Sequence, residues 1–208
     1  MTTRPARTGA TKQKLFTATL TLVAGKGMAG LTVDDIAAEA GVAKGTVYYN
    51  FGSKDGLIDA LLRHGLALLA DRLRAAEQAT DTDDVLALLV GGALEFFAEY
   101  PAFGQLLVSE LWRTPGQWHK TLSLLRDEIT SIMRGQLRRL ADLGRLPPEV
   151  DVRTAAGALF GTVLVVAMDW QVFTPERSLA EVRDSVLLLM RGIRGPLETS
   201  PLGGIGPT

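Results

Sequence analysis

The sequence predicts an all-α fold, in which a three-helix N-terminal unit precedes a larger helical bundle. Three observations support this prediction. A short helix, a glycine turn and a second short helix can be recognised within residues 31–57. Apolar residues then recur at the i, i+3, i+4, i+7 spacing of helices through most of the chain. Finally, 47% of the 208 residues are hydrophobic, which is enough for a sizeable core.

The chain opens with a segment rich in Thr, Arg, Pro and Gly, a composition that does not favour regular structure. We therefore expect residues 1–10 to form a flexible basic arm. A first helix is predicted from about Thr11 to Gly27. Gly25, Gly27 and Gly30 then make the chain more flexible before the next helix. The inward-facing residues of the first helix are Leu15, Ala18, Leu22 and Val23.

The start of the second helix carries strong local signals. Thr32 is a good N-cap, and Asp35 stands three residues later, where a carboxylate can reach back to the cap. Leu31 and Ile36 occupy the two positions of a hydrophobic staple. Gly41 follows at the position where a left-handed residue ends a helix at low cost. The sequence thus predicts a helix of only about two turns.

A third short helix is predicted to begin near Ala43 and to break at Gly52. Three apolar residues, Val42, Val47 and Phe51, are available to hold it against its neighbours. The outward-facing residues are Lys44, Gly45, Thr46, Tyr48, Tyr49 and Asn50. Two short helices around a glycine turn are typical of a helix-turn-helix, whose second helix enters the DNA major groove.

The segment from Gly41 to Leu57 resembles the helix-turn-helix signature of the TetR family of transcriptional regulators. The resemblance extends back through the preceding helix and covers roughly the first 60 residues. It departs from the usual pattern at Ala43, where Ser or Thr is common, and at Asn50 and Gly52, which replace a frequent His and Pro.

The resemblance implies a DNA-binding domain over residues 11–56, a helical ligand-binding and dimerisation domain over residues 57–197, and a flexible tail over residues 198–208. It also implies a ligand-responsive regulator, most simply a homodimeric repressor that leaves a palindromic operator when a small molecule binds. Arg4 and Arg7 of the arm either follow the phosphate backbone or only keep the chain soluble. The DNA contacts implied by the resemblance are Thr32, Ala43, Lys44, Gly45, Thr46, Tyr48, Tyr49 and Lys54.

Helical periodicity continues to the end of the chain. Helices are predicted from Ser53 to about Glu77, from Val85 to Tyr100, from Pro101 to Leu111 and from Trp118 to about Leu143. The last two, at about residues 152–173 and 178–197, are apolar on nearly every side. A helix that is apolar on every side must pack against other helices on every side, and one subunit of this size cannot easily supply enough of them. We expect residues 152–197 to form a four-helix dimer interface with a second copy.

Large apolar residues from several helices of the bundle are candidates for an effector pocket. The sequence leaves plain core packing open for each one. We assign the ligand site to Phe96, Phe97, Phe103, Trp112, Trp118, His119, Met133 and Phe160. A mostly apolar small molecule is favoured, because no glycine-rich phosphate loop is present.

Composition disfavours several other functions. The chain has no cysteine and two unpartnered histidines, so neither thiolate chemistry nor a metal site is predicted, and no cofactor is expected. An enzyme would lack candidate catalytic groups. Residues 1–63 hold eight Lys/Arg and five Asp/Glu, against fourteen and eighteen in residues 64–208, so the attraction for phosphate lies at the N-terminal end. We expect a cytoplasmic protein without membrane contact; the alternative function is a helical small-molecule-binding module without DNA binding.

Overall fold

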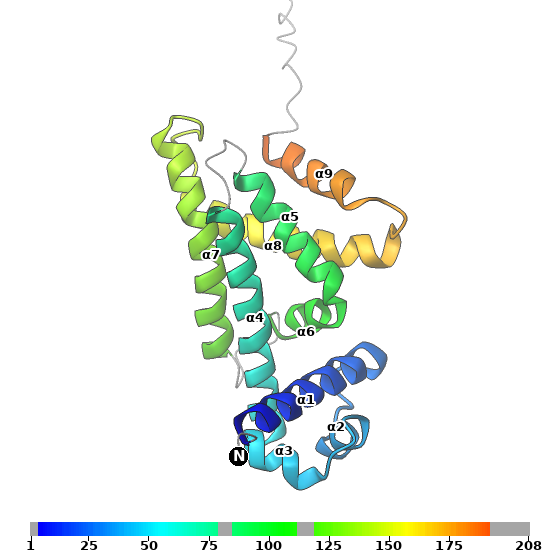
Figure 1. Ribbon diagram of the computed structural model, residues 1–208. Coiled ribbons are helices and arrows are strands. Elements are labelled where there is room, and N and C mark those ends of the chain that lie inside the picture. The colour runs from blue at the N-terminus through cyan, green and yellow to red at the C-terminus, as the bar shows by residue number, and fades with distance from the viewer. Residues whose placement is uncertain (1–3, 79–84, 112–118, 192–208) are drawn as a thin grey trace, which may run out of the picture.

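The computed structural model describes residues 4–78, 85–111 and 119–191. Across these ranges the chain forms nine helices and no strand, which confirms the all-α prediction (Figure 1). The tail, the break near residue 80, Trp112 and Trp118 lie outside the described residues. The helices are α1 (Arg4–Lys26), α2 (Val33–Glu39), α3 (Lys44–Phe51), α4 (Lys54–Gln78), α5 (Val85–Glu99), α6 (Pro101–Leu111), α7 (His119–Asp142), α8 (Val152–Phe173) and α9 (Leu179–Arg191).

The three-helix unit lies at one end of the molecule, where α1 crosses α2 and α3 packs on the start of α4 (Figure 1). Its core is made of side chains from all four helices. Those that are fully buried include Leu15, Ile36, Val47, Leu57 and Ile58. Because α2 and α3 are each too short to be stable alone, this shared core fixes their positions.

The predicted arm is wrong from Arg4 onward, since residues 4–10 form the first turns of α1. Pro5 does not prevent this helix. The first four N–H groups of a helix have no intrahelical acceptor, so a proline in the first turn removes no hydrogen bond. The predicted start near Thr11 is therefore seven residues late.

The helix α4 belongs to both halves of the molecule. Its first turns pack against α3, and its later turns pack against α5, α6 and α7. Buried residues follow one another along its whole length, from Leu57 at one end to Leu73 at the other. The two halves of the molecule therefore share one continuous helix.

Within the bundle, α8 packs against α5, α6, α7 and α9. It starts at Asp151, whose carboxylate accepts a hydrogen bond from the Thr154 N–H at 2.8 Å. By length and composition α8 could cross a bilayer, with a mean hydropathy of 1.5 over its most apolar stretch. Its inner face, from Ala156 to Ala167, packs into the common hydrophobic cluster, as in the core helix of a bundle.

The helix α6 packs closely on α4. The Phe103 ring packs directly on the backbone of α4 at Gly65, where a Cβ atom would stand 2.3 Å from the ring atom Cε2. Both residues are buried. Only a residue without a side chain permits this contact.

We predict that Gly65→Ala lowers stability by about 1–3 kcal/mol, the usual cost of overpacking a well-filled core. Gly92→Ala is the matched control. A Cβ atom there makes an ordinary 3.7 Å contact with Arg72 Cγ. That substitution should raise stability by about 0.4–1 kcal/mol. Thermal unfolding at one fixed protein concentration measures both, and equal midpoints for the two variants would contradict the prediction.

Candidate nucleic-acid interface

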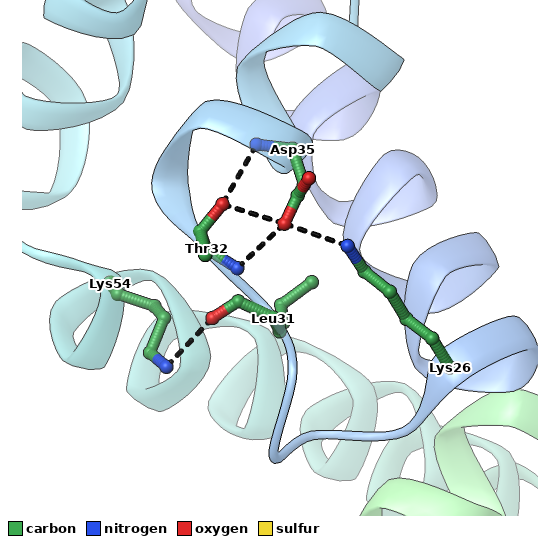
Figure 2. A network of polar contacts seen from close by, with 5 residues as sticks. All are labelled: Lys26, Leu31, Thr32, Asp35 and Lys54. Atoms are coloured by element: carbon green, nitrogen blue, oxygen red, sulfur yellow. Dashed lines mark hydrogen bonds and ion pairs between the residues drawn. The ribbon is translucent and has the colours of Figure 1, made fainter.

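The start of α2 is held by a complete capping box, as predicted. The Thr32 hydroxyl accepts a hydrogen bond from the Asp35 N–H at 3.1 Å, and the Thr32 N–H donates to Asp35 Oδ2 at 3.1 Å. The same carboxylate also binds Lys26 Nζ at 2.7 Å, from the last turn of α1 (Figure 2). This ion pair joins the end of α1 to the start of α2, and no pattern in the sequence indicated it.

These contacts change the acidity of Asp35. The hydrogen bonds from Lys26 and then from Thr32 stabilise the carboxylate and lower its pKa from 3.8 to about 2. The group is therefore ionised at neutral pH. Thr32, which was expected to contact DNA, has its hydroxyl and its N–H engaged within the capping box.

Lys54, another expected DNA contact, is also bound within the molecule. Its ammonium donates a hydrogen bond to the Leu31 carbonyl at 2.9 Å and so ties the first turn of α4 to the segment before α2 (Figure 2). An ammonium has three N–H donors, so two remain for a phosphate. The side chain is partly buried rather than freely extended.

Lys44, the first residue of α3, pairs with the exposed Asp34 of α2 at 2.8 Å. The hydrogen bond and the negative charge of Asp34 raise the pKa of Lys44. The pair fixes α3 relative to α2 at the end that would read bases. It also means that Lys44 must share its charge or exchange partners to bind DNA.

The helix α3 lies on the surface with half of its eight residues exposed. Val47 is its fully buried residue, whereas the side chains of Tyr48 and Tyr49 are 46% and 79% exposed. The space around Gly45 is open, with no atom within 4 Å of where a Cβ would stand. Ala43 occupies the N-cap position without a side-chain hydrogen bond, as its departure from the usual motif predicted.

The turns on either side of α3 need glycine. Gly41 and Gly52 have φ angles of 64° and 75°, in the left-handed region that other residues rarely adopt. Within α3, Asn50 Nδ2 donates to the Thr46 carbonyl at 2.8 Å, so the amide of Asn50 is used inside the helix.

The described residues of the candidate ligand site lie in the hydrophobic core. Phe96, Phe97, Phe103, Met133 and Phe160 are each at most 5% exposed and belong to one cluster. The Phe96 ring lies 5.4 Å from that of Phe97 and 5.8 Å from that of Phe103. The structure therefore brings Phe96, Phe97 and Phe103 together, whereas Met133 and Phe160 share only the common core with them. His119 begins α7, but its side chain lies outside the description, as do Trp112 and Trp118.

A metal centre is not found within the described parts of the chain, where no three His, Cys, Asp or Glu residues are grouped suitably. The geometry instead presents one short, exposed helix with two tyrosines, which is anchored by the buried Val47 and paired with α2 through Lys44 and Asp34. That arrangement suits insertion into a groove of DNA.

Comparisons with known proteins agree with this geometry. The family described as bacterial regulatory proteins, tetR family, matches residues 15–61. The HTH-type transcriptional regulator BetI 2 of Chromohalobacter salexigens is 31% identical over 149 residues, which is 71% of each chain. This chain belongs to the TetR family. It is a DNA-binding, ligand-responsive transcriptional regulator, and the alternative of a module without DNA binding is set aside.

Two further relatives span more of this TetR-family chain. The fatty acid metabolism regulator protein of Bacillus subtilis is 25% identical over 183 residues, 86% of this chain and 94% of its own. A solved structure of the transcriptional regulator FadR from B. subtilis, in complex with stearoyl-CoA, is 22% identical with a TM-score of 0.77. It covers 88% of this chain and 99% of that one, which supports the fold along the bundle.

We predict that Asp35→Asn destabilises the TetR-family domain most at neutral pH. The folded-state pKa of Asp35 lies below the unfolded value, so its contribution is present above about pH 4 and is lost as pH falls toward about 2. The stability difference between Asp35→Asn and wild type should therefore shrink from pH 7 to pH 3. Urea unfolding over this range measures it, with the exposed Glu39→Gln of the same helix as control. A pH-independent difference would contradict the prediction.

Proposed function

We propose that the protein is a cytoplasmic homodimeric repressor that binds a palindromic operator through α3 and is released by a mostly apolar effector. In this proposal residues 11–56 bind DNA, and residues 57–197 bind the effector and dimerise. The observation that carries it is the exposure of α3 on a unit whose core is otherwise closed. Because α4 crosses the proposed domain boundary, the two functions share a helix.

The eight proposed DNA contacts fall into three groups by their surroundings. Ala43, Gly45 and Thr46 lie in or beside the first turn of α3, where a recognition helix approaches base edges. Tyr48 and Tyr49 present phenols to phosphates. The remaining contacts, Thr32, Lys44 and Lys54, already have partners in the protein, so we propose that they position the interface as much as they bind DNA.

We predict that Gly45→Ala separates folding from DNA binding. The open space at Gly45 accepts a methyl group, and alanine favours the helix by about 0.5–1 kcal/mol. Against DNA the same methyl group would hold the α3 backbone away from the groove. We expect at least about a tenfold loss of affinity, or 1.4 kcal/mol. Fluorescence anisotropy with a duplex that the wild type enriches from a random library measures this loss.

The control for this prediction is Gly25→Ala, an equally open position in α1 outside the proposed interface. It should gain similar helix stability and bind DNA like wild type. If Gly45→Ala and the wild type bound DNA with equal affinity, Gly45 would not lie at the DNA contact.

The proposed dimer interface rests on apolar side chains that the subunit leaves uncovered. They come from the last two helices and are 38% to 74% exposed. These residues are Val165, Val172 and Phe173 of α8 and Leu188, Leu189 and Met190 of α9. An exposed apolar patch on two adjacent helices indicates a protein interface, and a second copy offers the same patch across a two-fold axis.

We predict that Leu188→Glu dissociates the dimer without unfolding the subunit, because Leu188 is 63% exposed. An unpaired charge buried in an interface costs about 3–5 kcal/mol, so the dissociation constant should rise at least about 100-fold. Sedimentation equilibrium measures it. Leu143→Glu, at an equally exposed position after α7, should leave the dimer intact. A dimeric Leu188→Glu protein would argue against this interface.

We further propose that the effector carries a long acyl chain. The buried aromatic cluster around Phe96 offers an apolar environment, and relatives of this chain are named as fatty acid metabolism regulators. Release would follow from differential affinity. Two recognition helices fit successive major grooves only about 34–36 Å apart, so an effector that favours another spacing weakens DNA binding. The Phe103–Gly65 contact offers a direct path from the cluster to α4.

The effector proposal is tested by adding stearoyl-CoA to the protein–DNA complex. We expect release of DNA and a higher midpoint of thermal unfolding, because a ligand that binds the folded state stabilises it by about 2.7 kcal/mol at 100 times its Kd. CoA alone and butyryl-CoA are the controls. Each buried CH₂ group contributes about 0.8 kcal/mol, so the short chain should act far more weakly. Equal effects of all three would point to the head group instead.

A further inference from the structure

The two lysines that the motif assigns to DNA, Lys44 and Lys54, already have partners within the protein, as does Lys26 at the end of α1. Lys26 binds Asp35, Lys44 binds Asp34, and Lys54 binds the Leu31 carbonyl. A phosphate has to compete with these internal partners for the N–H donors of the three lysines. A cation without an internal partner offers its charge and all its donors to a phosphate, so such cations are the stronger candidates for further phosphate contacts.

One such cation lies on α1, beside the recognition helix. Lys12 is exposed, and its ammonium stands 5.9 Å from the centre of the ring of Phe51, the last residue of α3. The same ring contacts Phe16 at 5.6 Å, one turn further along α1. Among the described side chains Lys12 has no carboxylate partner. Figure 1 shows the N-terminal end of α1 lying next to α3.

The position of Lys12 suits a phosphate of the same duplex. A recognition helix reads bases with its N-terminal residues, so its other end approaches the strand that borders the groove. The α3 helix is about 12 Å long, comparable with the width of the major groove. A cation at the Phe51 end of α3 therefore lies where that strand passes.

We propose that α1 forms a helical phosphate clamp centred on Lys12, continuous with the α3 interface. This inference rests on the proposed docking of α3. It gives to the helix α1 the phosphate contact that the sequence suggested for a flexible arm.

The chain supplies a matched control in Lys14. It is exposed and lies about 200° round α1 from Lys12, so it faces away from α3. Replacing either lysine by glutamine changes the net charge equally. Neither substitution touches the core, so both variants should fold.

The test measures affinity for the enriched duplex over a salt series. Each phosphate contact contributes about 0.9 to the slope of log K against log salt concentration, and a dimer brings two copies of Lys12. We expect Lys12→Gln to lower that slope by about 1.8. Lys12→Arg and Lys14→Gln should keep the wild-type slope.

An unchanged slope for Lys12→Gln, or an equal fall for Lys14→Gln, would overturn the clamp while leaving the DNA-binding proposal intact. If the wild-type protein enriched no duplex at all, the clamp and the proposed function would both fail. The two failures are therefore distinguishable.

Discussion

The fixed placement of α3 on its neighbours is the constraint on which the DNA-binding unit depends. An eight-residue helix is not stable in water by itself, so its position is set by tertiary contacts. The buried Val47 anchors it from below. At one end Lys44 pairs with Asp34, and at the other Phe51 packs against Phe16 of α1. With α3 held by these contacts, Tyr48 and Tyr49 remain exposed to solvent.

The same logic extends through α4 to the bundle. Gly65 lets the Phe103 ring rest on the α4 backbone. On the side facing α7, Arg63 and Asp59 both hydrogen-bond to the buried Thr121 hydroxyl, at 2.8 and 2.6 Å. These contacts couple α4 to α6 and α7, so a rearrangement of the bundle can reach α3 without passing through a flexible linker. Exposed apolar residues remain on α8 and α9. Figure 1 shows α9 at the end of the molecule away from α3, with α8 crossing the middle of the bundle.

The candidate DNA site could be predicted residue by residue only in part. The exposure of Tyr48, Tyr49 and Gly45 followed from the motif, because the apolar residues of α3 must face the core. The internal partners of Lys44 and Lys54 could not be predicted. Both depend on atoms from other elements that only folding brings within 3 Å. The effector site is harder still, since buried aromatic residues have the same sequence pattern whether they line a pocket or fill a core.

By itself, the sequence determined the features that are local. The capping box at Thr32, the left-handed Gly41 and Gly52, and the proline at the start of α6 are each specified by neighbouring residues, and so are the helix boundaries they set. Tertiary structure decided how the charges are used. Lys26, twelve residues after Lys14, is drawn to Asp35 in another helix, whereas Lys12 is left beside α3. The reason is physical: backbone preferences act within one turn, but an ion pair forms between whichever opposite charges the packed core brings together.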